Sequence, residues 1–369
     1  MTRLFFFELF ALIFFSFNSF SADLDLRVSQ LETHMRQVRT KTESNTYGAK
    51  TGLKKEDKEG VYGVSIGLGT LYQTALLGGA GYSYTNDHQG SQYPKNGELR
   101  QIDNTWSFGV NGTLSYQFPH DGEQVSLYNC FYNQSSSNSV SSAIDSSILQ
   151  LKAMGDIIPA SSFFYCNQAK SSLDITYDLL SLELARDFYL SQYLSIRPNT
   201  GLLSSWVWLK NQTSYSGGLD LGGNRIYVED RTNWYGIGPK LGVDLVFGLG
   251  HGISFFGEIT GSLLYGRNKV LHQERYSAND IQVVNIQSQT HTLIPYSLGS
   301  IGFCFESSFF DDKNLFKFRV AYQNQIFVGM NQMIQVGGYS LQETYADTIQ
   351  KQAGSLVTSG FLFDLLWSF

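Results

Sequence analysis

Residues 357–369 read VTSGFLFDLLWSF and largely alternate between apolar and polar side chains. A period of two is that of a β-strand with two unlike faces, although Ser359, Leu362 and Leu366 depart from the pattern. The apolar face is rich in aromatic residues, and no turn residues follow it. Such a face is typical of the closing strand of an outer-membrane barrel, where it meets lipid. The residues of the apolar parity are Val357, Phe361, Phe363, Leu365, Trp367 and Phe369.

The composition agrees with a membrane barrel. The chain has 369 residues, of which 15% are aromatic and 16% charged, and its mean hydropathy is -0.15. It is too polar on average for a bundle of membrane helices and poor in charge for a soluble protein. A barrel has this average because each strand presents one face to lipid and the other to the lumen. After residue 20 there is no apolar run of about 18 residues, so no further helical span is expected.

Residues 1–22 are predicted to form a secretory signal peptide. Arg3 precedes an apolar stretch from Leu4 to Phe17, and the small residues Ser21 and Ala22 offer a cleavage site. The alternative is an uncleaved anchor helix. It is disfavoured because the stretch is short and Glu8 interrupts it. The sequence therefore predicts export of the mature protein beyond the inner membrane.

Residues 23–45 are predicted to form a short amphipathic or coiled-coil helix, and residues 46–60 a charged linker. Apolar side chains follow a heptad spacing, which is that of a coiled coil. Two heptads are marginal for a free helix in water, so the seam suits either a homo-oligomer or a monomeric helix lying on the barrel mouth or the membrane. The seam residues are Leu24, Val28, Leu31, Met35 and Val38.

Residues 61–369 are predicted to form an all-β, transmembrane, antiparallel up-and-down barrel. Short connections, such as Gly248 to Gly252, alternate with long ones, and short turns belong on the periplasmic side. Ten strands is the best count, and twelve is the alternative, because a long loop can contain another hairpin. The closing strand should pair with the strand at Tyr62 to Leu68. A soluble sandwich is disfavoured by the aromatic-rich outer faces and the signal peptide. The ten predicted strands are 61–75, 104–118, 123–133, 171–189, 193–211, 231–248, 252–266, 291–309, 315–328 and 356–369. The long connections cover 78–104, 134–170, 212–230, 266–290 and 329–355.

The polar parity of these strands predicts a charged lumen. Asp174, Thr176 and Asp178 would share this face with Glu183 if a bulge falls near Leu179. Arg197 should approach Glu183 or Asp187, and Glu306 should face Lys317 or Arg319. Such a lining either tunes the selectivity of a water-filled channel or fills a narrow barrel with ion pairs. The candidate pore-lining residues are Glu183, Asp187, Arg197, Lys240, Asp244, Glu258, Glu306, Lys317, Arg319 and Asp364.

Other functional classes have less support in the sequence. An outer-membrane protease of the omptin kind would need a histidine with carboxylates at the extracellular side, where only His88, His272 and His291 are expected. No spacing distinguishes them from ordinary loop residues, so no enzyme, cofactor or metal is expected. Three cysteines form at most one bridge, and the alternative is cross-linking between chains at the surface. These are Cys130, Cys166 and Cys304.

Several segments resemble the major outer-membrane protein family of Legionella and chlamydia-like bacteria. The most specific are YDLLSLELAR at residues 177–186 and YLSIRP at 193–198. The ending at Phe369 also resembles the signal by which the barrel assembly machinery recognises its substrates. The resemblance implies an abundant, pore-forming surface protein. The other similar segments are 27–32, 35–40, 47–51, 118–122, 236–240, 262–266 and 331–333.

Together these features predict an outer-membrane porin through which small hydrophilic solutes or ions diffuse passively. The alternative is a structural or surface-binding, adhesin-like barrel without an open pore. Outer-membrane lipid and the assembly machinery are the expected partners, and no nucleic acid is.

Overall fold

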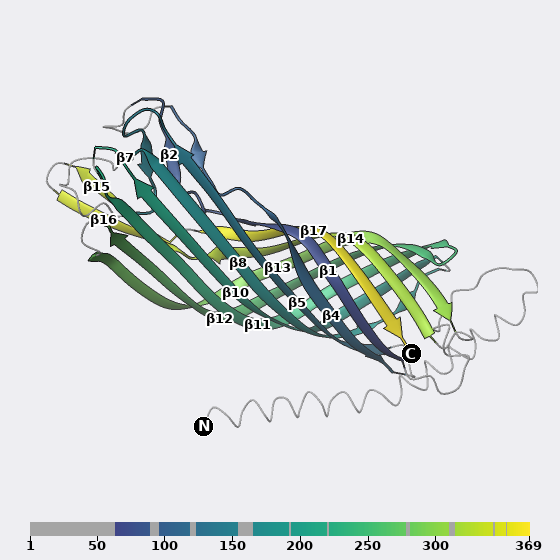
Figure 1. The fold of residues 1–369 in the computed structure, drawn as a ribbon. Helices are drawn as coiled ribbons and strands as arrows, with labels where there is room; N and C mark the ends of the chain where they lie inside the picture. Colours follow the sequence, from purple (N-terminus) through teal and green to yellow (C-terminus); the bar gives the residue numbers. More distant parts are fainter. Residues whose placement is uncertain are drawn as a thin grey trace, which may run out of the picture.

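The protein is a closed antiparallel barrel of ten strands, as its computed structural model shows (Figure 1). The structure describes residues 63–88, 96–118, 123–153, 165–191, 193–219, 221–277, 281–309, 314–341, 344–351 and 353–369. The barrel strands are β1 (Gly63–Leu77), β4 (Trp106–Gln117), β5 (Glu123–Ser141), β8 (Gln168–Arg186), β10 (Leu194–Ser216), β11 (Arg225–Gly250), β12 (Ile253–Tyr276), β13 (Ile281–Phe309), β14 (Asn314–Asn331) and β17 (Gly354–Ser368). A two-residue strand, β9 (Phe188–Tyr189), pairs with β10 alone.

The closing strand pairs as its alternation predicts. Leu68 lies opposite Leu365 and Ile66 opposite Trp367, so the even-numbered apolar face of β1 joins the odd-numbered face of β17. The amide of Phe369 also donates a hydrogen bond to the carbonyl of Val64 at 2.9 Å. The other side of β17 pairs with β14, which completes the ring.

Two small sheets lie at one end of the barrel, called here the loop end (Figure 1). One has four strands, β2 (Ser83–Thr85), β3 (Leu99–Arg100), β6 (Ile148–Gln150) and β7 (Tyr165–Cys166). The other is the hairpin of β15 (Ile334–Leu341) and β16 (Thr344–Lys351). Neither sheet joins the barrel ladder, so the extra hairpin does exist but the twelve-strand alternative is wrong.

Short connections lie at the opposite end, called here the turn end. Between β11 and β12 the chain reverses through Gly250, His251 and Gly252, all with positive φ. At the loop end the strands extend much farther than expected, and β13 has 29 residues where about ten would cross a bilayer. The predicted loops 212–230 and 266–290 are therefore largely strand. Their ladders continue beyond the apolar band, where the outer face turns polar and the apolar signal of the sequence stops.

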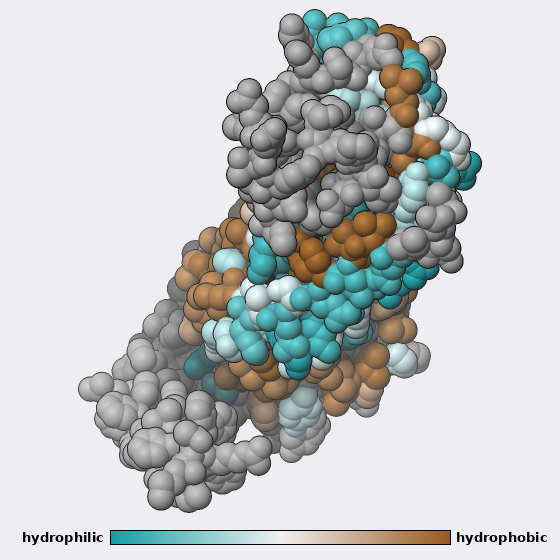
Figure 2. All heavy atoms as spheres, turned by 90° about the vertical axis from the view of Figure 1, so that its left-hand side faces the viewer, coloured by the Kyte–Doolittle hydropathy of each residue, from teal (hydrophilic) through white to brown (hydrophobic). Residues whose placement is uncertain are grey.

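The wall changes character along the barrel axis. Near the turn end its outer face is apolar, with exposed side chains such as Leu68, Phe108 and Ile259. Near the loop end the outer face carries polar residues such as Asn133 and Gln212. Viewed from the loop end, hydrophilic side chains cover much of the nearer wall and hydrophobic ones gather farther back (Figure 2). The apolar outer band therefore marks the part of the barrel that lies in lipid.

The bulge expected in β8 is absent. Its register with β5 and β10 runs without interruption, so the odd-numbered residues stay inside and Asp174, Thr176 and Asp178 lie on the outer face. There Asn129 donates a hydrogen bond to Asp178 at 2.7 Å, and Ser135 one to Asp174 at 2.6 Å. The inward assignment of these three residues was wrong, because a strand that leaves the membrane presents its polar side chains to water on the outside.

The predictions for residues 1–22, 23–45 and 46–60 lie outside the described residues, and with them the seam of Leu24, Val28, Leu31, Met35 and Val38. In the part of the chain that is described, no helix has the length and apolar character to cross a bilayer.

Candidate functional site

The turn-end half of the lumen contains a charged cluster on β8, β10 and β11. Arg197 lies at its centre, 3.4 Å from Glu183, 3.9 Å from Asp187 and 3.8 Å from Asp244. The ammonium of Lys240 contacts the other oxygen of Glu183 at 2.7 Å. Arg197 therefore lies near both of its predicted partners and also near Asp244.

A second charged cluster lines β12, β13, β14 and β17. Lys317 contacts Glu306 at 2.8 Å, whereas Arg319 contacts Asp364 at 2.5 Å. The sequence left both cations as candidate partners of Glu306. The register decides between them, because β14 places Lys317 beside Glu306 on one side and Arg319 beside Asp364 on the other.

The two clusters meet where Asp244 of β11 lies opposite Glu258 of β12. All ten candidate residues thus belong to one half of the lumen, and we call them the charged ring. The ring has six carboxylates and four cations, so its formal charge is 4 - 6 = -2. A lumen lined with excess negative charge favours cations over anions.

Gly69 provides the room for one contact of the ring. A Cβ built on Gly69 would lie 2.1 Å from Oδ1 of Asp364 and 2.2 Å from Oδ1 of Asn111. Asn111 donates a hydrogen bond to Asp364 at 2.7 Å across this position. Because residue 69 is glycine, Asn111 of β4 can reach Asp364 of β17 across β1. The carboxylate of Asp364 is thereby held where Arg319 contacts it.

Several inward polar atoms have no hydrogen-bond partner among the described residues. Nε of Arg197, which is 3.9 Å from Asp187, makes no hydrogen bond, and neither does Nε of Arg319 or Oδ1 of Asn199. Buried polar groups without partners are costly, so native structures pair them with protein or with water. The charged half of the lumen is therefore suited to hold water. Further inward atoms of this kind belong to Ser115, Ser254, Thr260 and Gln323.

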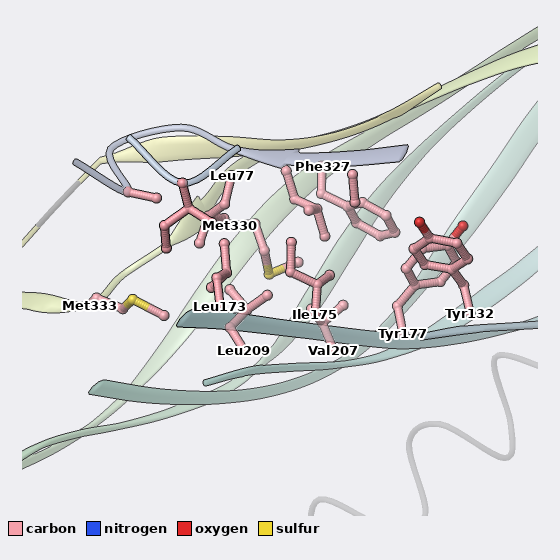
Figure 3. Close-up of a cluster of buried hydrophobic side chains, with 14 of the residues drawn as sticks. Leu77, Tyr132, Leu173, Ile175, Tyr177, Val207, Leu209, Phe327, Met330 and Met333 are labelled. Carbon is pink, nitrogen blue, oxygen red and sulfur yellow. The ribbon is translucent and has the colours of Figure 1, made fainter. Parts of the chain in front are cut away.

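The loop-end half of the lumen is closed by apolar side chains (Figure 3). Tyr177 of β8 and Phe327 of β14 come from opposite walls, yet their ring centroids are 6.1 Å apart. Tyr132 packs on Tyr177 at 5.3 Å, and Tyr296 packs on Phe327 at 4.9 Å. We call these four rings the aromatic bar. Aliphatic residues continue it toward the loop end, among them Leu77, Leu173, Ile175, Leu209, Met330 and Met333.

The hydroxyl groups of the aromatic bar are held by hydrogen bonds. Tyr132 donates to Oε1 of Gln134 at 2.7 Å and lies within hydrogen-bond distance of the carbonyl of Gln73. The amide of Gln73 donates to the hydroxyl of Tyr177. This constriction was not predicted from the sequence, because the expected bulge in β8 would turn Tyr177 outward. Uninterrupted alternation through residues 173–185 would have placed it inside.

The cysteines do not form a reactive surface. Cys130, Cys166 and Cys304 are all buried and are not joined by disulfides. The interpretation of surface cross-linking is therefore wrong, since each thiol is buried in the barrel interior or in the four-stranded sheet.

The structure does not bring the candidate histidines together. His88 contacts Asp87 in an exposed loop, His272 is buried in the barrel, and His291 stacks on Tyr265 at the outer face. Across the described residues no group of His, Cys, Asp and Glu is arranged to hold a metal ion.

The fold and the apolar outer band define the class as an outer-membrane β-barrel. The chain belongs to the Legionella pneumophila major outer membrane protein family, which it matches over residues 61–369. The protein is accordingly located in the outer membrane, as predicted. A comparison with curated proteins finds no match.

Solved structures of outer-membrane channels resemble the chain only loosely. The monoaromatic hydrocarbon channel TodX, as a deltaS2S3 mutant, is 9% identical with a TM-score of 0.30, covering 85% of this chain and 91% of its own. The toluene transporter TodX of P. putida is 8% identical with a TM-score of 0.28 and the same coverage. A Pseudomonas aeruginosa FadL homologue is 6% identical with a TM-score of 0.23, covering 84% and 90%. Likenesses this loose do not identify a shared type of channel.

Proposed function

We propose that the protein is a narrow outer-membrane channel for small hydrophilic solutes and ions, with a preference for cations. The charged ring forms a wet vestibule at the periplasmic half, and the aromatic bar gates the passage above it. The observation that carries this proposal is the set of inward polar atoms without hydrogen bonds in the charged half of the lumen, which require water. A channel interior built only to stabilise the barrel would pair these groups.

The gate follows from the physics of a narrow apolar constriction. Such a segment excludes water, and ions then cannot cross it until it widens. Tyr177 and Phe327 meet between opposite strands, so a change of their side-chain rotamers would open the lumen at this level. Passage is therefore expected as brief openings of low conductance.

Single-channel recording in planar bilayers tests the proposal. The wild-type protein should show small, brief, cation-selective steps, and the double variant Tyr177→Ala with Phe327→Ala should show larger and longer ones. The matched control is Tyr322→Ala with Phe361→Ala, because this pair, 5.6 Å apart, is on the outer face. The control should conduct as the wild type does. Folding of each variant is checked by its β-sheet circular dichroism and its heat-dependent electrophoretic mobility.

A second candidate is a structural or surface-binding barrel without a pore. The apolar core that fills the loop-end lumen favours it, since ten-stranded barrels are narrow enough to be filled by side chains. If neither the wild type nor the folded Tyr177→Ala, Phe327→Ala variant conducts, the channel proposal is refuted and this candidate replaces it.

A further inference from the structure

A group of basic residues lies directly above the apolar band on three neighbouring strands. On these strands the band ends at Trp208 of β10, Tyr235 of β11 and Tyr265 of β12, all exposed. Aromatic residues of this kind mark the interface between lipid tails and headgroups. We call the cations that follow them the basic rim, which comprises Lys210, Arg231, Arg267 and Lys269.

The barrel register brings the basic rim together. Lys210 lies opposite Arg231, and Arg267 of β12 lies opposite Tyr235, which is four residues from Arg231 on β11. Lys269 lies opposite Asn233, which is two residues from Arg231. All four face outward, because the inward parity of these strands belongs to residues such as Asn211, Thr232 and Asn268. Adjacent strands are about 5 Å apart and residues rise about 3.3 Å along a strand, so the rim spans roughly 15 Å, a span over which its long side chains can contact a ligand with more than one phosphate.

On the barrel strands, the outward Lys and Arg side chains at this level lie on this arc of the wall. Glu229 is the carboxylate that contacts the rim, through Arg231. On the neighbouring strand β8, Asp174 lies opposite Lys210 and Asp178 opposite Trp206, and both are held by hydrogen bonds to β5. On the other side β13 places Gln289 opposite Lys269, and opposite Arg267 it places His291, which stacks on Tyr265. Nε of Arg267 has no hydrogen-bond partner among the described residues.

The position of the rim identifies the kind of partner. Long connections face outward in outer-membrane barrels, so the rim lies at the headgroup level of the outer leaflet. Below it the wall is apolar, with Ile237 and Leu263 exposed. A ligand that fits both surfaces has acyl chains and more than one phosphate. We propose that the basic rim binds the phosphates of an anionic glycolipid of the outer leaflet, whose acyl chains lie along β11 and β12.

Lipid titration of the purified protein tests this proposal. Three proteins are placed in nanodiscs of zwitterionic lipid. They are the wild type, a variant in which all four rim residues are changed to glutamine, and a control variant that also has four substitutions. Each is titrated with a bis-phosphorylated acylated glucosamine disaccharide, with its dephosphorylated form and with inorganic phosphate. In the control, four exposed cations away from the apolar band are changed to glutamine, so that it loses the same amount of charge. These residues are Lys170, Arg225, Arg275 and Lys351. Native mass spectrometry measures the bound glycolipid.

Wild type and control should bind the phosphorylated glycolipid equally. The rim variant should lose affinity on the order of a thousandfold at low salt, because four charges near an anionic headgroup are removed. Equal binding by the rim variant, equal loss in the control, or binding of the dephosphorylated form would overturn the proposal. Saturation by inorganic phosphate at similar concentration would also do so, since it would identify a site for the free ion. If the variant with four substitutions does not fold, Arg267→Gln and Lys269→Gln singly should each reduce binding about fivefold, and unchanged binding by both would overturn the proposal.

Discussion

Replacing His272 by glutamine should remove a pH dependence of stability that the wild-type protein shows. His272 lies seven residues beyond the end of the apolar band on β12, inside the barrel and fully buried. Its Nδ1 is 2.6 Å from Oδ1 of Asp230, and its Nε2 is 2.9 Å from Oε1 of Glu274. Lys152, which follows β6 of the four-stranded sheet, contacts Asp230 at 3.4 Å. The cluster therefore ties this sheet to the barrel wall.

The magnitude follows from the pKa of the imidazole. Burial by itself lowers this pKa, but hydrogen bonds and charge from Asp230 and Glu274 outweigh it and raise the pKa from 6.5 to about 9. A raised pKa stabilises the folded state fully below about 6.5, and the contribution is lost as pH rises through about 9. The difference corresponds to about 3 kcal/mol, since one pKa unit is about 1.4 kcal/mol.

Guanidinium chloride unfolding in detergent measures the effect. Between about pH 6 and about pH 10, wild type should lose about 3 kcal/mol of unfolding free energy relative to His272→Gln. The control is His291→Gln, which changes a histidine on the outer face. A constant difference between wild type and His272→Gln across this range would refute the reasoning.

The remaining predictions concern the charged ring. Arg197→Glu and Arg319→Glu should each shift the reversal potential toward stronger cation selectivity, and unchanged potentials would show that the charged ring does not set the selectivity. Gly69→Ala should lower the melting temperature, with a cost of about 1–3 kcal/mol, because its Cβ would displace the oxygens of Asp364 and Asn111. Glu306→Gln should change stability by less than about 1 kcal/mol, since its contact with Lys317 is over a third exposed; a larger loss in unfolding experiments would contradict this.

Local alternation was enough to predict much of the barrel. The parity of Phe363 and Leu68 correctly predicted the seam between the last and first strands. Ten strands followed from the alternation of short and long connections, and the inward charges at Arg197 and Glu306 followed from parity. These features depend on the two-residue period of a strand, which sequence reveals directly.

The length of the strands beyond the apolar band and the inward position of Tyr177 were not predicted from the alternation. Beyond the band both faces of a strand can be polar, so the extensions of β11 to β13 looked like loops. The assumed bulge in β8 concealed Tyr177, because one residue of shift turns every side chain to the other face.

The sequence by itself determined that the chain forms a barrel, which side chains line its charged half and where the lipid band lies, because each depends on period and polarity along one strand. Only the tertiary structure decided that Tyr177 meets Phe327 across the lumen, that Arg319 pairs with Asp364 and that Lys210 joins Arg231 on the outer wall. Closure and register bring distant residues together, and neither leaves a local signal in the sequence.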